Sequence, residues 1–160
     1  MPHVASLLRV ARRLTPDPAT AEDLVQETML LAWRGFLGFE RGTNARAWLF
    51  RILFNAFHGS ARRAPYTFST APEPEAGSIR PMFQEAAEIA EALEALSLEQ
   101  RTVLLVCVVE GFTCSEAAKI LDLPMGTVMS RLGRAREQLR KMLEPAAKAA
   151  DTRAKAAYNR

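Results

Sequence analysis

The feature that most constrains this chain is the stretch from Thr113 to Leu143, whose pattern predicts two helices separated by a tight turn. Thr113 and Glu116 have the spacing of a capping box, in which each side chain binds a backbone amide near the other residue. Residues 122–124 then interrupt the apolar period. Pro124 suits the first turn of a new helix, where its missing N–H costs nothing. The stretch therefore predicts a helical hairpin with a short connection.

The second helix of this hairpin has two distinct faces. Its apolar side chains recur at helical spacing and form one stripe: Val128, Leu132, Ala135 and Leu139. The opposite face carries short polar residues and arginines: Thr127, Ser130, Arg131 and Arg134. Such a face is typical of a helix-turn-helix that enters the major groove of DNA, where arginine binds a guanine edge or a phosphate. Any amphipathic hairpin of a small domain has similar spacing, so both interpretations stay open here.

Charge is unevenly distributed along the 160 residues. Residues 1–64 hold nine Arg and no Lys against five acidic residues (+4), and residues 65–96 hold one Arg against six Glu (−5). Residues 97–143 hold seven basic and five acidic residues (+2), and residues 144–160 hold four and two (+2). Two basic segments around an acidic one suit a protein that contacts a polyanion at two places, although solvated arginine faces give the same pattern.

Residue types that carry reactive chemistry are scarce. Two His, two Cys and no glycine-rich phosphate loop predict no catalytic constellation, metal site, cofactor or small-molecule substrate. Cys107 lies in the apolar run TVLLVCVV and is predicted to be a core thiol. No secretory signal pattern and no apolar run of about 20 residues is present, so we expect a cytoplasmic protein without membrane insertion.

Residues 1–64 predict a compact bundle of about three helices. One helix ends at Leu14, and the next spans about residues 18–36 with an apolar inner face. Its outer face is mixed and consists of Asp23, Gln26, Glu27, Leu30 and Arg34. Taken alone, this outer face is typical of an ordinary solvated surface.

The most apolar helix is predicted from Ala45 to about Arg63, after a glycine-containing loop and a capping Asn44. It has one polar strip, whose side chains point within roughly 60° of one another around the helix axis: Arg51, Asn55, His58 and Arg62. A helix this apolar must be enclosed by neighbours, so Trp33, Trp48 and most phenylalanines are predicted to lie in the core. Arginine beside aromatic rings can also hold single-stranded nucleic acid.

The remaining chain predicts a linker and a second bundle. Residues 65–83 contain four prolines and predict a flexible linker. Residues 84–96 predict an acidic helix, and residues 98–110 a buried helix that Gly111 ends. With the helix-turn-helix they form a second bundle over 84–143, and Pro145 is expected to leave 144–160 as a low-complexity tail. The predicted fold is therefore all-α, with two small helical bundles joined by a Pro-rich linker.

Three segments in this order resemble one protein family. They are AEDLVQET at 21–28, GTNARAWLFRILFN at 42–55 and GTVMSRLGRAR at 126–136. Together they are similar to bacterial RNA polymerase sigma factors of the extracytoplasmic-function (ECF) class. The resemblance implies a transcription initiation factor that binds core RNA polymerase, directs it to promoters and helps to melt the minus-ten region. It implies a region 2-like domain over 1–64 and a region 4-like domain over 84–143.

The resemblance also assigns roles to the polar faces. Asp23, Gln26, Glu27, Leu30 and Arg34 would dock on the clamp helices of the largest polymerase subunit. The loop over 38–44 and the following helix would recognise the melted minus-ten element and capture a flipped base through Arg46, Arg51, Asn55, His58, Arg62 and Arg63. Duplex DNA of the minus-thirty-five element would be bound by Thr127, Ser130, Arg131 and Arg134. Met129 stands where relatives commonly carry Lys or Arg, and an anti-sigma factor is implied as a regulatory partner.

Three other interpretations remain. A sigma-like decoy would titrate an anti-sigma factor without initiating transcription, although such proteins usually carry a receiver domain as well. A plain helix-turn-helix regulator would bind duplex DNA without polymerase, and the motif AEDLVQET argues against it. An enzyme is the third class, and the lack of a reactive constellation disfavours it.

Overall fold

The computed structural model describes residues 3–40, 42–63 and 80–158, and gives the backbone alone for 61–63, 80–86 and 145–158. Every regular element in the described part is helical, which confirms the predicted all-α fold. The elements are α1 (Val4–Leu14), α2 (Pro18–Gly35), η1 (Phe36–Gly38), α3 (Ala45–Arg63), α4 (Arg80–Glu94), α5 (Leu98–Leu104), η2 (Leu105–Val109), α6 (Cys114–Leu121) and α7 (Met125–Tyr158). The short η1 is a 3₁₀ turn and η2 is a π-helical turn.

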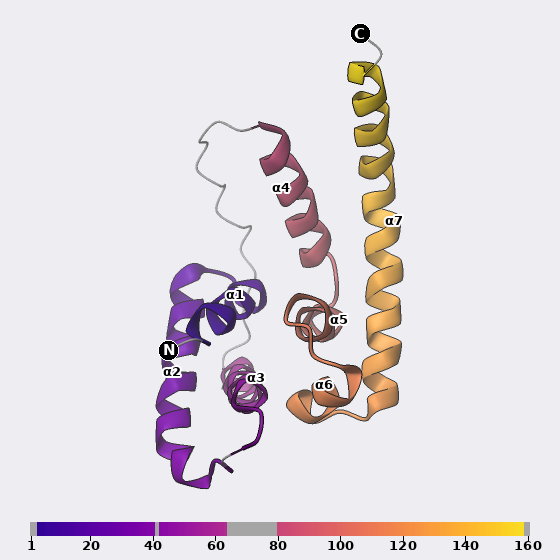
Figure 1. Ribbon diagram of the computed structural model, residues 1–160. Coiled ribbons are helices and arrows are strands. Elements are labelled where there is room, and N and C mark those ends of the chain that lie inside the picture. The colour runs from indigo at the N-terminus through magenta and orange to yellow at the C-terminus, as the bar shows by residue number, and fades with distance from the viewer. Residues whose placement is uncertain (1–2, 41, 64–79, 159–160) are drawn as a thin grey trace.

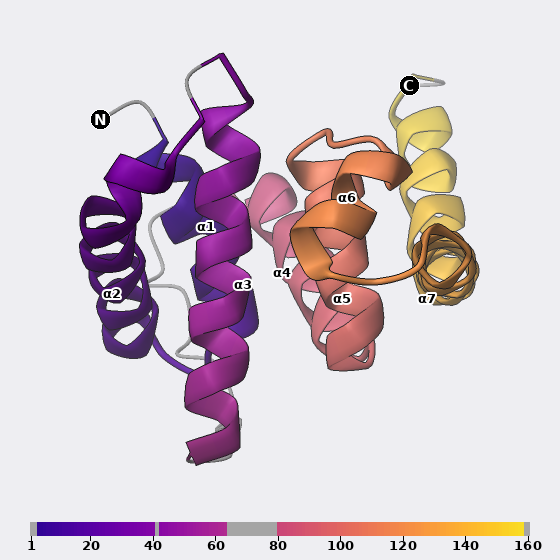
Figure 2. The same ribbon diagram turned by 90° about the horizontal axis from the view of Figure 1, so that it is seen from below.

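The helices form two groups that pack against each other (Figure 1). We call α1–α3 the first half and α4–α7 the second half. Helix α3 lies beside α6, as the view from below also shows (Figure 2), and α1 contacts α5. One buried cluster includes Leu7 and Phe54 of the first half together with Val106 and Val128 of the second. The two predicted bundles are therefore present, but their apolar core is continuous.

Local capping interactions explain where α2 and α3 begin. Asp17 caps α2 by accepting from the Thr20 backbone amide at 2.9 Å and the Thr20 hydroxyl at 2.6 Å, and these bonds lower the pKa of Asp17. Pro18 occupies the first turn of α2. The Asn44 side chain accepts from the Ala47 amide at 3.1 Å and caps α3 as predicted.

The helix-turn-helix also follows its local signals. The capping box predicted at Thr113 and Glu116 is formed, and Ser97 with Gln100 forms a second one at the start of α5. Asp122 ends α6 in the left-handed conformation, at φ 53°, which aspartate tolerates better than most residues. The Pro124 carbonyl then accepts from the backbone amides of Thr127 and Val128, so α7 begins directly after it. These contacts fix the angle at which α7 leaves the turn.

Three sequence-based expectations about the fold are wrong. Helix α4 begins at Arg80, so the last residues assigned to the linker are helical; residues 64–79 of the linker lie outside the described part. Helix α7 continues through Pro145 to Tyr158, because the many alanines around Pro145 are strong helix formers and offset the cost of about 3 kcal/mol that a proline carries inside a helix. Trp33 is 75% exposed rather than buried, because it lies on the outer side of α2 beyond Leu30.

Candidate nucleic-acid interface

The polar strip of α3 lies at the surface. The side chains of Arg51, Asn55 and His58 are all exposed, while those of Arg62 and Arg63 lie outside the described part. Phe50, Leu53 and Phe54 on the other side of α3 are buried. The apolar side of α3 therefore packs into the core, and the described side chains of the strip face away from it.

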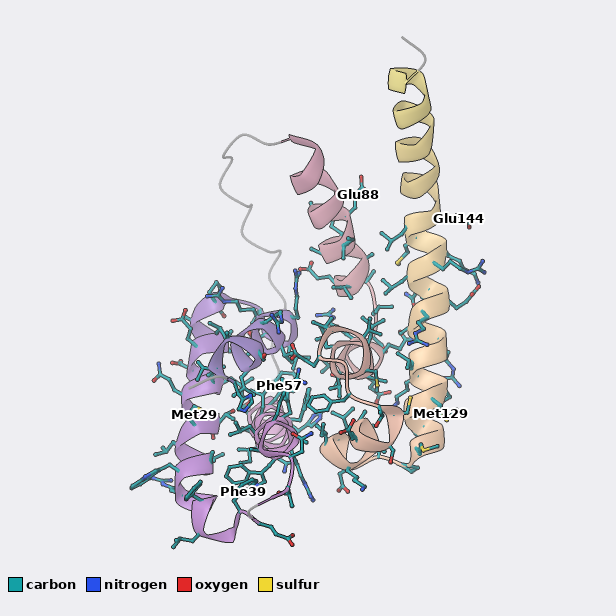
Figure 3. All side chains as sticks on the ribbon, in the orientation of Figure 1. Met29, Phe39, Phe57, Glu88, Met129 and Glu144 are labelled. Carbon is teal, nitrogen blue, oxygen red and sulfur yellow. The ribbon has the colours of Figure 1, made fainter. Side chains whose placement is uncertain are left out.

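The loop before α3 is held by aromatic contacts. The Phe39 ring lies 4.9 Å from the Trp48 ring and 6.4 Å from the Phe36 ring, between centroids. Figure 3 shows Phe39 on this connection, next to the start of α3. Gly42 adopts φ 94°, a left-handed backbone that favours glycine. Aromatic rings beside an exposed loop offer surfaces on which a base can stack.

Arg46 is not on the polar strip. At about 100° per residue, it points roughly 140–180° away from Arg51 and Asn55 around the α3 axis. Its guanidinium instead binds the Glu110 side chain and donates to the Glu110 carbonyl at 2.8 Å. The structure therefore separates Arg46 from the other predicted nucleic-acid residues of α3.

The first turns of α7 present the predicted reading face. Ser130 and Arg134 are exposed and Thr127 is half-buried, and the Ser130 hydroxyl donates to the Thr127 carbonyl at 3.1 Å. Met129 is exposed close to the N-terminal end of α7 (Figure 3). Arg131 differs, because its side chain is only 25% exposed and its Nη2 lies 3.0 Å from Oε2 of Glu99. Of the two predicted arginines, Arg134 is the more accessible to DNA.

The outer face of α2 is fully accessible. The five residues assigned to polymerase docking are all exposed: Asp23, Gln26, Glu27, Leu30 and Arg34. Trp33 and Leu37, which is 100% exposed, continue the apolar part of this side beyond Leu30. Exposed apolar side chains that gather beside charged ones are a mark of a protein-binding surface.

Cys107 does not provide a reactive thiolate. Burial raises the pKa of Cys107 to about 11, and a hydrogen bond with Cys114 adds to the effect, so the Cys107 thiolate is scarce at neutral pH. Within the described ranges, no group of His, Cys, Asp or Glu side chains could hold a metal ion. The same ranges contain no helix long and apolar enough to cross a membrane.

Sequence reasoning missed three charged residues at the contact between the halves, namely Arg9, Arg101 and Glu110. Arg101 and Glu110 are buried, and Arg9 binds Glu110. A signal was present for Arg101, which falls on the apolar side of its helix between Leu98 and Leu105. Glu110 is the last residue of the helix predicted to be buried, directly before Gly111, and no local pattern indicates which charged residue it pairs with.

Comparison with known proteins identifies the family of this chain. Residues 1–64 match the family model Sigma-70 region 2, and residues 86–139 match Sigma-70, region 4. The ECF RNA polymerase sigma factor EcfG of Rhodopseudomonas palustris is 34% identical over 145 residues, which cover 88% of this chain and 80% of EcfG. The chain belongs to the ECF sigma factors. As a sigma factor it is a transcription initiation factor that directs RNA polymerase to promoters.

Two solved structures are similar to this sigma factor. The sigma factor RpoE of Bartonella quintana, solved with the anti-sigma factor NepR, has a TM-score of 0.75 and 33% identity, covering 88% of this chain and 91% of RpoE. The anti-anti-sigma factor PhyR of the same organism, also solved with NepR, has a TM-score of 0.58. At 18% identity and 48% coverage of PhyR, that likeness concerns the fold alone.

Proposed function

We propose that this sigma factor binds polymerase and the two promoter elements through three separate surfaces. The outer face of α2 binds the clamp helices of core RNA polymerase, and the 38–44 loop with the α3 strip recognises and helps to melt the minus-ten element. The first turns of α7 enter the major groove at the minus-thirty-five element. Its place of action is then the nucleoid. The observation that carries the proposal is that matches to regions 2 and 4 coincide with three exposed faces of suitable chemistry.

The physical case for melting rests on charge and stacking. Unpairing a base costs a few kcal/mol, and contacts to the freed strand offset this cost without covalent chemistry. The aromatic rings around the 38–44 loop and the exposed Arg51 supply stacking and phosphate contacts of that kind. No cofactor is needed for such a step.

We also propose regulation by an anti-sigma factor. The similar sigma factor RpoE was solved in complex with the anti-sigma factor NepR. The exposed apolar side chains Leu30, Trp33 and Leu37 give an occluding helix a surface to cover. An anti-sigma factor bound there would compete directly with polymerase.

Transcription in a purified system tests the function. The chain is added to bacterial core polymerase with fragmented genomic DNA from the organism that encodes it, and transcript starts are mapped. Starts preceded by two shared sequence blocks are expected. An absence of transcripts, with intact folding and no polymerase binding, would contradict the proposal and favour a sigma-like decoy or a plain helix-turn-helix regulator.

The two arginines of α7 are expected to contribute unequally to duplex binding. Arg134→Ala should weaken binding to a mapped minus-thirty-five duplex about tenfold. The slope of log affinity against log salt concentration should fall by about 1, the value for one lost phosphate contact. Arg131→Ala should have a smaller effect, because Glu99 already holds this side chain. Fluorescence anisotropy over a range of salt concentrations measures both. Arg140→Ala is the control, since Arg140 is exposed on α7 and pairs with Glu137; an equal loss in this variant would refute the assignment.

A further inference from the structure

Glu110 joins the two halves of the molecule through a buried carboxylate. It belongs to the second half, and its side chain has no exposed surface. Oε1 lies 3.1 Å from Nη2 of Arg9 on α1, and Oε2 binds Nη2 of Arg46 on α3. Both arginines belong to the first half, so one carboxylate holds two helices of the other group.

An aromatic contact completes this arrangement. Phe112, two residues after Glu110, meets the Phe50 ring of α3 edge-on, with 5.5 Å between the centroids. The Arg46 guanidinium lies 4.5 Å from the centre of the Phe112 ring. A cation over an aromatic face is attracted to it, and more strongly when water is excluded. We call Glu110, Phe112, Arg9 and Arg46 the interdomain latch.

The Arg46 guanidinium of the latch can exchange one anionic partner for another. The Glu110 side chain is fully buried, whereas the side chains of Arg9 and Arg46 keep 54% and 31% of their exposure. Removing the carboxylate from water offsets part of the attraction, so the net contribution of these ion pairs is smaller than their geometry suggests. Arginine binds carboxylate and phosphate oxygens with the same planar fork. A DNA phosphate can therefore take the place of the Glu110 carboxylate on Arg46, at the cost of exposing the apolar cluster that the two halves share.

The connection between the halves leaves room for separation. Residues 64–79 join α3 to α4, and a chain of that length can span at most about 55 Å. Arg46 also lies only two residues after Asn44, the end of the loop proposed to capture a base. Once the halves part, the Arg46 guanidinium is unpaired near the 38–44 loop, on the side of α3 opposite Arg51 and Asn55.

We propose that Glu110 competes with promoter phosphate for Arg46, so that the closed form described here withholds Arg46 from DNA until the two halves separate. The proposal rests on the proposed function in one respect, the binding of the minus-ten element by the first half. Arg9 is then a second guanidinium at the same anion site. The latch is an autoinhibitory contact, because it keeps Arg46 from DNA in the closed form.

Glu110→Gln in the full chain tests the latch, with two readouts. Small-angle scattering should report a larger radius of gyration, and a forked minus-ten promoter fragment should bind roughly tenfold more tightly. Arg46→Gln should open the chain as well but give no tighter binding, and the double variant should behave like Arg46→Gln. Glu137→Gln is the control, because it removes the same charge from an exposed ion pair within α7. Circular dichroism and thermal melting verify folding of each variant.

Three outcomes would overturn the proposal. The first is an unchanged radius of gyration in both Glu110→Gln and Glu110→Ala. The second is an open Glu110→Gln chain that binds DNA no more tightly than the Glu137→Gln control. The third is a double variant that keeps the gain in affinity. Scattering reports opening whether or not the chain supports transcription, so failure of the latch and failure of the proposed function are separate results.

Discussion

Replacing Arg101 by methionine should lower the free energy of unfolding by about 3 kcal/mol, because a buried guanidinium would no longer satisfy several carbonyls. Its Nε donates to the Leu93 carbonyl at 2.9 Å, and its Nη2 donates to the Glu94 carbonyl at 2.7 Å. Its Nη1 crosses to the other half and donates to the Arg13 carbonyl at 3.2 Å. The last carbonyls of a helix have no partner within it, so Arg101 stabilises the end of α4.

Urea unfolding followed by far-ultraviolet circular dichroism measures this loss. Arg101→Lys should be intermediate, since a lysine ammonium cannot reproduce the planar fork that reaches carbonyls of both halves. Arg140→Met on the exposed side of α7 is the control and should change stability by less than about 0.5 kcal/mol. Equal effects of Arg101→Met and Arg140→Met would contradict the capping role.

Changing Asp23 and Gln26 together to alanine should weaken binding to core polymerase by roughly 100-fold. Contacts at the centre of an interface contribute on the order of 1–2 kcal/mol each, and two of them combine to this change. Both side chains are exposed on α2, so the fold should remain intact. Competition against a labelled sigma factor on purified core enzyme gives the affinity.

A matched double variant separates docking from a general loss of charge. Glu137→Ala with Gln138→Ala removes one carboxylate and one amide from α7, far along the chain from α2. This control should retain polymerase affinity within about twofold. Full affinity of the Asp23 and Gln26 variant would refute the docking role of the α2 face, whatever the promoter experiments show.

The latch and the α2 face have different consequences for regulation. The α2 face is exposed in the closed form, so the docking proposed for this face does not require the halves to separate. Arg46 is engaged by Glu110 in that form. In the proposed order of events, α2 docks on the polymerase first and α7 then binds the polymerase or the promoter at a second place. The second contact would pull the halves apart, so Arg46 would be released only in the assembled complex.

The sequence by itself determined the helices and the two principal faces. Capping at Asp17, Ser97 and Thr113, and the break before Pro124, depend on contacts within a few residues, which a local pattern encodes. The same holds for the exposed outer face of α2, because the apolar period of a helix fixes which side is buried. The order of three motifs then indicated the family.

Only the tertiary structure decided how the halves meet and what that does to individual residues. Arg46 and Arg9 bind a carboxylate that lies 64 and 101 positions away in the chain, a separation over which no helical period carries information. Trp33 was assigned to the core by its residue type, yet the first half already encloses α3 with other side chains. Pairings of this kind depend on the shapes of two assembled surfaces, so they are fixed only when the whole chain has packed.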